Sequence, residues 1–317
     1  IADGATFTFN YGLYYQTPVY RHVYKNINRS DDPQEALEEE NPTLGNATMT
    51  ASRTQAYEFG FNIQVNRYWA FSLMGWVKDM DQLVSTKTQR TGIYTYDVTA
   101  NGDYGTAQGI DFTLQNRGML INTMLQYTYS VAKANGDYDA SAFGSYVDAP
   151  SQQYLMPFDR THDLALSLYT FLPFGINASM THFYQSGFPY TPMKFNGRDP
   201  EEDTFNKNAN RSSDWYWANL SFSKFVEFNK FKMTLGLNIY NFLDSRNEVD
   251  IYPLTGVAES CPDENPNCTD DEMVPNPGEY YLDEVGAGGD YSSAYYDRPW
   301  MFSSPKEINF FVRIDFN

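Results

Sequence analysis

Apolar and polar residues alternate along several stretches of this chain, with the two-residue period of a β-strand that has one apolar face. The clearest stretch is 231–240. Its first face carries Phe231, Met233, Leu235, Leu237 and Ile239, and its second carries Lys232, Thr234, Gly236 and Asn238. The same alternation recurs at 57–65, 110–115, 163–168 and 308–316.

This alternation predicts ten strands. They span roughly 5–15, 53–65, 69–79, 106–116, 119–131, 161–171, 175–186, 214–226, 230–242 and 305–316. Each has about the 9–11 residues that a tilted strand needs to cross a bilayer. The strand lengths therefore favour a membrane-spanning sheet.

The predicted connections alternate between short and long. The short ones are 66–68, 117–118, 173–174 and 227–229, and the long ones lie near 16–52, 80–105, 132–160, 187–213 and 243–304. Outer-membrane barrels have short periplasmic turns and long loops outside the cell. A compact soluble domain rarely has so many loops of more than about 20 residues.

These patterns predict an all-β fold, a transmembrane antiparallel up-and-down β-barrel of about ten strands, with residues 1–317 as one barrel domain. No run of about 20 apolar residues predicts a transmembrane helix. Aromatic residues near strand ends suit interfacial girdles. They also suit a soluble β-sandwich or a β-rich adhesin, in which the apolar faces would be buried in a dry interior.

Composition narrows the class of partner. The 317 residues include 26 Tyr and 23 Phe, and the formal net charge is −18. A nucleic-acid partner is excluded, because phosphate binding needs clustered Lys and Arg. The same charge argues against attachment to anionic lipid through a basic face.

Five motifs in order resemble those of TonB-dependent outer-membrane receptors. They are the strand end Tyr11–Pro18 with Asn41-Pro-Thr-Leu44, the strand start Tyr57-Glu-Phe-Gly60, the outer strand end 78–84, the strand start 107–111, and Asn238-Ile-Tyr-Asn-Phe-Leu-Asp244. Gly45-Asn46 stands where the family often has Pro-Glu. The chain ends in an aromatic strand residue, Phe316, followed by Asn317.

The resemblance covers nearly the whole chain and implies the last ten strands of a 22-strand barrel. The family's plug and its TonB-contacting box have no counterpart, and Ile1–Thr6 has no leader-like pattern, so we expect a piece of a longer protein. The implied activity is uptake of a scarce solute across the bacterial outer membrane. The implied partners are membrane lipid, TonB through the plug, the solute and a possible surface lipoprotein.

The long connection 243–304 is unusually acidic, with 13 Asp and Glu and no Lys or Arg between Asn247 and Asp297. It contains the two cysteines, Cys261 and Cys268, which we expect to form a disulfide outside the cytoplasm. Oxygen ligands for Ca²⁺ are available at Asp263, Glu264, Asn265, Asp270, Asp271 and Glu272. A solvated acidic loop without a metal or other cofactor is the alternative interpretation.

Loop aromatics are the candidate ligand contacts, because aromatic faces bind sugar rings and peptide side chains. They are Tyr94, Tyr96 and Tyr104 in one connection, and Tyr280, Tyr281, Tyr291, Tyr295, Tyr296 and Trp300 in another. Packing within and between the long loops explains them equally well. Five charged residues are placed on the inner face, namely Lys78, Asp111, Asp163, Arg313 and Asp315, and we expect them to pair with each other.

No catalytic motif is present, so the sequence predicts a non-enzymatic protein. His162 and Asp163 are adjacent on a strand and point to opposite faces. The competing hypothesis is a self-contained ten-strand outer-membrane protein, such as an omptin-like protease. It would need paired Asp and His groups at the outer rim, where His22 is the only candidate. Under the transport hypothesis, acidic loops favour a neutral, cationic or Ca²⁺-bridged solute over an anionic iron chelate.

Overall fold

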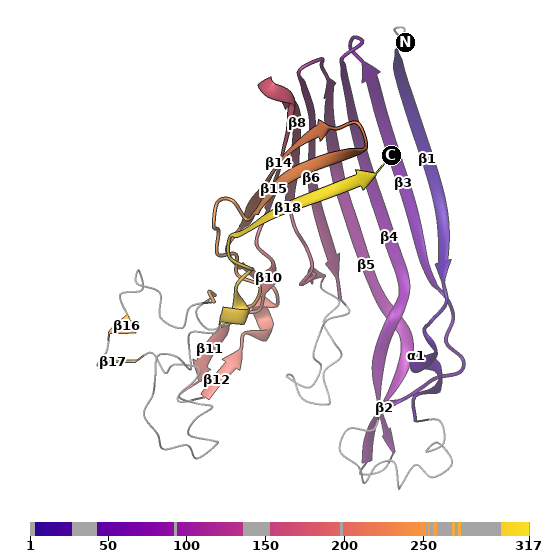
Figure 1. The fold of residues 1–317 in the computed structure, drawn as a ribbon. Coiled ribbons are helices and arrows are strands. Elements are labelled where there is room, and N and C mark those ends of the chain that lie inside the picture. Colours follow the sequence, from indigo (N-terminus) through magenta and orange to yellow (C-terminus); the bar gives the residue numbers. More distant parts are fainter. Residues whose placement is uncertain are drawn as a thin grey trace.

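The computed structural model describes residues 4–26, 43–91, 94–135, 153–196, 199–251, 253, 256–258, 268–269, 272–273 and 299–316. Most of these residues lie in antiparallel strands, and the single α-helix among them is α1 (Tyr20–Tyr24). Figure 1 shows a tall, curved sheet with short turns at one end and long connections at the other. None of the helices in these ranges has the length and apolar character needed to cross a membrane.

Ten strands form the continuous path of a 12-stranded sheet, in the order β1-β3-β4-β5-β6-β8-β9-β14-β15-β18. The other two, β2 (Thr43–Leu44) and β7 (Tyr154–Leu155), pair with β5 and β6 off this path. The bounds of the ten are β1 (Ala5–Gln16), β3 (Ser52–Gln64), β4 (Trp69–Thr91), β5 (Tyr94–Arg117), β6 (Ile121–Ala134), β8 (His162–Leu172), β9 (Ile176–Gln185), β14 (Trp215–Glu227), β15 (Phe231–Tyr240) and β18 (Glu307–Phe316). Each strand pairs antiparallel with the next along the sheet. All ten predicted strands are therefore confirmed, and so is the up-and-down antiparallel arrangement.

The sheet is open, with β1 and β18 at its two edges. Figure 1 shows β14, β15 and β18 running obliquely to β1, β3 and β4, as expected for a sheet with the normal strand twist. An open edge has unpaired N–H and C=O groups, which lipid cannot satisfy. In a membrane, both edges would therefore need strand partners.

The register places the apolar rows on one face, which we call the outer face. It includes Phe59 and Phe61 of β3 opposite Phe9 and Phe7 of β1. Large side chains on this face are exposed, for example Phe59 at 53% and Phe310 at 70%. No second sheet of the described residues covers them, because the other sheets have two strands each. The β-sandwich and adhesin hypotheses, which require these rows to be buried, are therefore wrong.

The opposite face, the inner face, carries mainly Ser, Thr, Asn, Gln and Gly. Small residues allow large neighbours to lie flat, as at Gly236, where an added Cβ would lie 2.1 Å from the ring of Phe311. One apolar face and one polar face on each strand is the pattern of a barrel with lipid outside and water inside.

The connection predicted at 80–105 is the main difference from the sequence analysis, because it is a strand extension rather than a loop. β4 continues to Thr91 and β5 starts at Tyr94, so the two strands project beyond their neighbours (Figure 1). We call residues 83–91 and 94–104 the hairpin tower. Register shifts occur between Met80 and Val84, where Gln82 has φ 56°. β-Bulges of this kind increase the local twist.

The tower is joined to the first long connection. β2 (Thr43–Leu44) pairs in parallel with Asp97 and Val98 of β5. The Thr99 hydroxyl donates to the carbonyl of His22 at 2.6 Å, which holds α1 against β5. The sequence predicted a loop here, because residues such as Thr, Lys, Gln and Tyr in this segment show no alternation of apolar and polar side chains. The strands form nonetheless, because the backbone hydrogen bonds of a β-ladder do not depend on that alternation.

The other long connections contain short elements. They are β7 (Tyr154–Leu155), β10 (Pro189–Tyr190), β11 (Met193–Asn196), β12 (Asp199–Glu202), the 3-10 helix η4 (Thr204–Asn206), β13 (Asn210–Arg211), β16 (Cys268–Thr269), β17 (Glu272–Met273) and η5 (Pro299–Met301). The short connection between β8 and β9 is η3 (Pro173–Gly175). β10 pairs with β13, and β11 pairs with β12.

Candidate ligand-binding surface

The inner face near the long connections, which we call the mouth, gathers aromatic and charged side chains from several strands. On β4, β5 and β6, a carboxylate is held by two neutral donors. The Trp76 indole N–H donates to Asp111 Oδ2 at 3.0 Å, and the Thr128 hydroxyl donates to Asp111 Oδ1 at 2.7 Å. This arrangement fixes both the carboxylate and the indole ring on the inner face.

Glycine makes room for this indole. Trp76 is opposite Gly109 in the register, and a Cβ at Gly109 would lie 2.6 Å from the Trp76 ring. Lys78 Nζ lies 5.2 Å from the centroid of the same ring, within the range of a cation–π contact. The wall of the mouth therefore has an aromatic ring, an ammonium group and a carboxylate side by side.

A second group of residues comes from β8, β9 and β14. The Gln185 amide donates to Asp163 Oδ2 at 2.6 Å. Phe183 and Trp217, opposite each other in the register, stack with ring centroids 4.8 Å apart. Trp215 follows on the same face, and its indole N–H is buried without a hydrogen-bond partner in the described structure. Such a donor is costly to bury, so this position favours a polar ligand atom or water.

An ion pair anchors the connection before β8 to the one before β14. Arg211 pairs with Asp159, whose side chain is 1% exposed. Asp159 Oδ1 also accepts the backbone N–H of Ala132 at 2.7 Å, and Arg211 donates to the carbonyl of Gly187 at 2.8 Å. The buried carboxylate is thus fully supplied with donors, as a buried charge requires.

Arg160 lies beside this ion pair. Its guanidinium is 5.2 Å from the ring centroid of Phe188 and 5.9 Å from that of Trp215. Burial lowers the pKa of Arg160 from its ordinary value, and the neighbouring Arg211 lowers it further. The cation remains charged at neutral pH, because the ordinary value is so high. It is therefore a fixed positive charge above the aromatic rings of the mouth.

Buried polar side chains hold the connections over this part of the mouth. We call residues 153–161, 186–214 and 241–251, in their described parts, the loop shelf. Asn247 bonds both backbone groups of Tyr216, at 2.9 and 3.1 Å. Glu248 accepts the N–H of Ala258 at 2.8 Å, and Asn208 donates to the carbonyl of Leu155 at 2.7 Å. These bonds to backbone groups give the shelf a defined shape.

The predicted ligand tyrosines fall into two sets. Tyr94, Tyr96 and Tyr104 lie on β5 in the hairpin tower, away from the mouth residues above. Tyr104 is half-buried, and its backbone bonds Asn135. Trp300 is 72% exposed in η5. The remaining candidates, Tyr280, Tyr281, Tyr291, Tyr295 and Tyr296, lie outside the described residues, so ligand contact there stays a prediction.

The disulfide and the calcium site also stay predictions. Cys268 is in β16 and Glu272 is in β17, and these two strands pair with each other. Cys261, Asp263, Glu264, Asn265, Asp270 and Asp271 lie outside the described residues. Among the residues that the structure describes, no group of three or more His, Cys, Asp and Glu is arranged to hold a metal ion.

The inner-face charges behave in two ways. Arg313 Nε donates to Asp315 Oδ1 at 2.9 Å, as predicted for paired charges. Asp111 and Asp163 instead accept from neutral Trp, Thr and Gln side chains. The sequence analysis missed Trp76, Phe183, Trp215 and Trp217 as site residues. The expectation of interfacial girdles for strand-end aromatics is wrong for Trp76, Trp215 and Trp217, which lie on the inner face. Strand parity was the signal that could have found them.

The histidines do not form a catalytic pair in the described residues. His22 is in α1, where its carbonyl accepts from Thr99 and from the N–H of Asn46. A 2.8 Å hydrogen bond joins His162 Nδ1 to the Tyr127 hydroxyl. Both side chains are on the outer face. Tyr127 is opposite Leu164 in the register, and His162 is opposite Tyr129, which in turn is opposite Ile110.

The chain is similar to known proteins in structure but not in sequence. No known family and no curated protein matches the sequence. The outer-membrane transporter YddB from Escherichia coli is similar in structure, with a TM-score of 0.56 and 13% identity over 78% of this chain and 36% of that one. The ferric-catecholate import receptor Fiu from E. coli K12 gives 0.52 and 12% identity over 80% of this chain and 30% of that one. The siderophore receptor PiuA from Acinetobacter baumannii gives 0.52 and 12% identity over 78% and 31%.

These solved structures are an outer-membrane transporter, an import receptor and a siderophore receptor. The chain therefore has the fold of a segment of their barrel, and the resemblance seen in the sequence motifs is confirmed at the level of fold. The chain spans about a third of the length of these receptors.

Proposed function

We propose that this chain is a barrel segment of a TonB-dependent outer-membrane receptor that imports a scarce solute. The observation that carries the proposal is the open sheet of ten sequential antiparallel strands, apolar on its exposed outer face and polar on its inner face. A water-filled or plug-filled barrel needs an apolar outer face and a polar inner face. In a β-sandwich, the apolar faces are inside and pack against each other, and the polar faces meet water.

We infer the membrane orientation from the lengths of the connections. Short turns at 65–68, 118–120, 173–175 and 228–230 would face the periplasm, and the hairpin tower and loop shelf would lie outside the cell. The mouth would then be the first part of the inner wall that an incoming solute meets. TonB would act through a plug, and a surface lipoprotein is a possible partner of the long connections.

The mouth favours a solute with hydroxyl, amide or cationic groups. Asp111 and Asp163 offer carboxylate oxygens, and the Phe183–Trp217 pair and Trp76 offer aromatic surface. Lys78 and Arg160 provide fixed positive charges, so a zwitterionic solute also suits the site. Oligosaccharides, peptides and cobalamin-like solutes have this chemistry, with or without a bridging Ca²⁺ in the acidic connection.

Uptake by cells that produce the full protein tests the proposal. Labelled maltoheptaose, a trilysine peptide and an anionic ferric catecholate would be offered with and without a protonophore. We expect energy-dependent uptake of a neutral or cationic probe, reduced when Trp217→Ala removes the stacked ring. Energy-independent leakage of all three probes would contradict active import. Uptake of the ferric catecholate alone would overturn the proposed solute class.

The protease alternative gains no support from the described residues, because His22 is bonded through its backbone and has no carboxylate partner there. Incubating the protein with a quenched fluorescent peptide distinguishes the two functions. We expect no turnover.

A further inference from the structure

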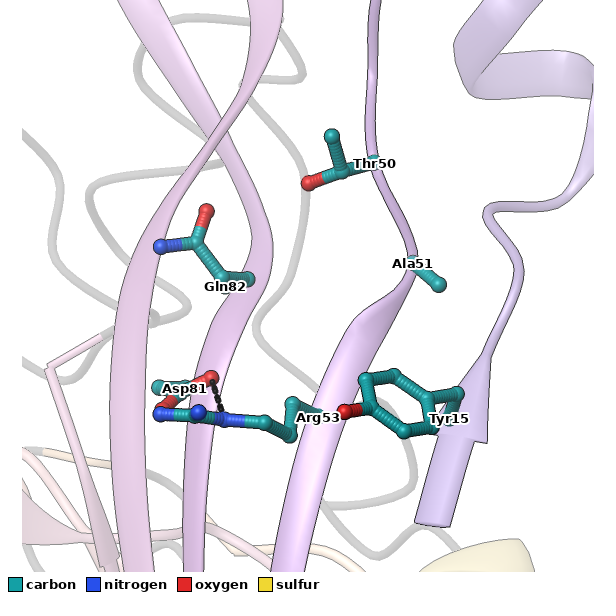
Figure 2. A pocket seen from close by; sticks show the side chains of 6 residues that line it. All are labelled: Tyr15, Thr50, Ala51, Arg53, Asp81 and Gln82. Atoms are coloured by element: carbon teal, nitrogen blue, oxygen red, sulfur yellow. Dashed lines mark hydrogen bonds and ion pairs between the residues drawn. The ribbon is translucent and has the colours of Figure 1, made fainter.

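A pocket of about 460 Å³ lies on the outer face, outside the site described above. Figure 2 shows its six lining residues, Tyr15, Thr50, Ala51, Arg53, Asp81 and Gln82. They come from β1, the segment before β3, β3 itself, and β4 at the bulge. The volume is within the range of sites for small ligands.

The pocket lies beyond the apolar band of the sheet. Tyr15, Arg53 and Asp81 form one row across β1, β3 and β4, four residues beyond the row of Tyr11, Tyr57 and Val77. At about 3.3 Å per residue, the pocket is about 13 Å further along the strands. Under the proposed orientation, this level corresponds to the polar layer of the outer leaflet rather than to its hydrocarbon.

The pair Arg53–Asp81 supplies both donors and acceptors. Arg53 Nε lies 3.1 and 3.0 Å from the two Asp81 oxygens, and Nη2 also contacts Asp81. In the described structure, the hydrogen bonds of Arg53 all go to Asp81 and involve Nε and Nη2, which leaves the Nη1 donors for another partner. The two side chains are 43% and 39% exposed, so a ligand can reach both.

An aromatic side chain completes the pocket. Tyr15 is 64% exposed, and Figure 2 shows its hydroxyl directed toward Arg53. Its ring can stack on the apolar face of a ligand, and its hydroxyl can donate or accept.

The walls of the pocket are fixed by the base of the hairpin tower. Asn101 donates to the carbonyls of Thr50 at 2.9 Å and Gln82 at 2.8 Å. The Ser52 hydroxyl donates to the same Gln82 carbonyl at 3.0 Å. The bulge at Gln82 therefore opens the pocket, and Asn101 ties its two sides together.

We propose that this pocket binds a sugar ring with adjacent hydroxyl groups. A guanidinium and a carboxylate side by side match the donors and acceptors of a vicinal diol, and a tyrosine ring suits the apolar face of the sugar. An isolated phosphate is disfavoured, because Asp81 already neutralises Arg53 and repels a second anion. The sugar comes either from a glycolipid headgroup of the surrounding leaflet or from a soluble oligosaccharide.

Two binding measurements on the full protein test the proposal and distinguish the sources. Native mass spectrometry counts monoglucosyl diacylglycerol bound from phosphatidylcholine nanodiscs, and saturation-transfer NMR follows maltose binding in the same nanodiscs. We expect Arg53→Met to weaken binding about tenfold, as for loss of hydrogen bonds to a charged group. Tyr15→Ala should weaken it severalfold without disturbing the fold, because Tyr15 is so exposed.

Asp79→Asn is the matched control, since Asp79 is on the same face one row below the pocket. It should leave binding unchanged. Glycolipid binding alone identifies a headgroup site, and maltose binding alone identifies a site for soluble sugar. Binding of neither by the wild-type protein overturns the inference. So does binding that neither Arg53→Met nor Tyr15→Ala weakens when each is combined with Trp217→Ala, which removes the stacked ring of the mouth.

The inference uses the membrane orientation of the proposed function, but its test does not depend on import. Arg53→Met and Tyr15→Ala lie outside the mouth and should leave solute uptake unchanged. If the wild-type protein binds the sugar but shows no solute uptake, the result contradicts the transport proposal and leaves the sugar site standing.

Discussion

The hairpin tower and the loop shelf extend the same sheet beyond the barrel wall by different means. The tower continues the backbone ladder of β4 and β5 through one bulge, with few buried side chains. The shelf ends the strands at the rim and is held by buried polar side chains such as Asn208, Asn247 and Glu248. Ladder bonds are independent of side-chain identity, so the tower should tolerate substitution better than the shelf.

The largest expected difference concerns the two ion pairs. Arg211→Met should lower the free energy of unfolding by about 3–5 kcal/mol, because it leaves the buried Asp159 carboxylate unpaired. Arg53→Met at the base of the tower should cost at most about 1 kcal/mol, because both partners are exposed. Urea unfolding of the protein in detergent micelles, followed by tryptophan fluorescence, measures both. Equal costs would contradict the comparison.

A pair of glycine substitutions gives the next effect. A Cβ at Gly187 in the shelf would lie 1.8 Å from the Ser212 carbonyl oxygen, so Gly187→Ala must displace backbone and should cost about 1–3 kcal/mol. At Gly102 in the tower, the nearest atoms are 3.7 Å away. Gly102→Ala should change stability by less than about 0.5 kcal/mol. A thermal unfolding series on the two variants decides whether the shelf is the tighter structure.

Two asparagines sharpen the comparison at a smaller scale. Asn247→Ala should cost about 1–3 kcal/mol, because it leaves part-buried backbone groups of Tyr216 without partners. Asn101→Ala frees the more accessible Thr50 and Gln82 groups and should cost about 1 kcal/mol. Hydrogen exchange should then accelerate around residues 214–217 in the first variant and 49–52 in the second. Acceleration spread over the whole sheet in either variant would argue against separate regions.

The smallest effect is expected at the inner wall. Lys78→Gln removes a cation–π contact with Trp76 and should cost under about 1 kcal/mol. Lys78→Gln should reduce solute uptake clearly while leaving the free energy of unfolding almost unchanged, because Lys78 lies in the mouth. Parallel measurements of unfolding and uptake separate the two effects, and an unchanged solute affinity would remove Lys78 from the ligand-binding surface.

The sequence predicted much of the inner wall but not its chemistry. Strand parity correctly placed Asp111 and Asp163 on the inner face. It did not reveal that Trp76 and Thr128 hold one carboxylate and Gln185 the other, because these donors come from neighbouring strands. The sequence predicted ligand contacts by tyrosines in the long connections. In the residues that the structure describes, the aromatic side chains of the mouth lie on β4, β9 and β14.

By itself, the amino-acid sequence determined the ten strands and their two faces. The reason is local, because the pleat of a strand places alternate residues on opposite faces whatever the rest of the chain does. Only the tertiary structure decided that 80–105 is a twisted hairpin, that Asp159 pairs with Arg211, and that Tyr15, Arg53 and Asp81 share a pocket. Those features depend on register and on a bulge, which bring together residues far apart in the chain and leave no periodic mark in the sequence.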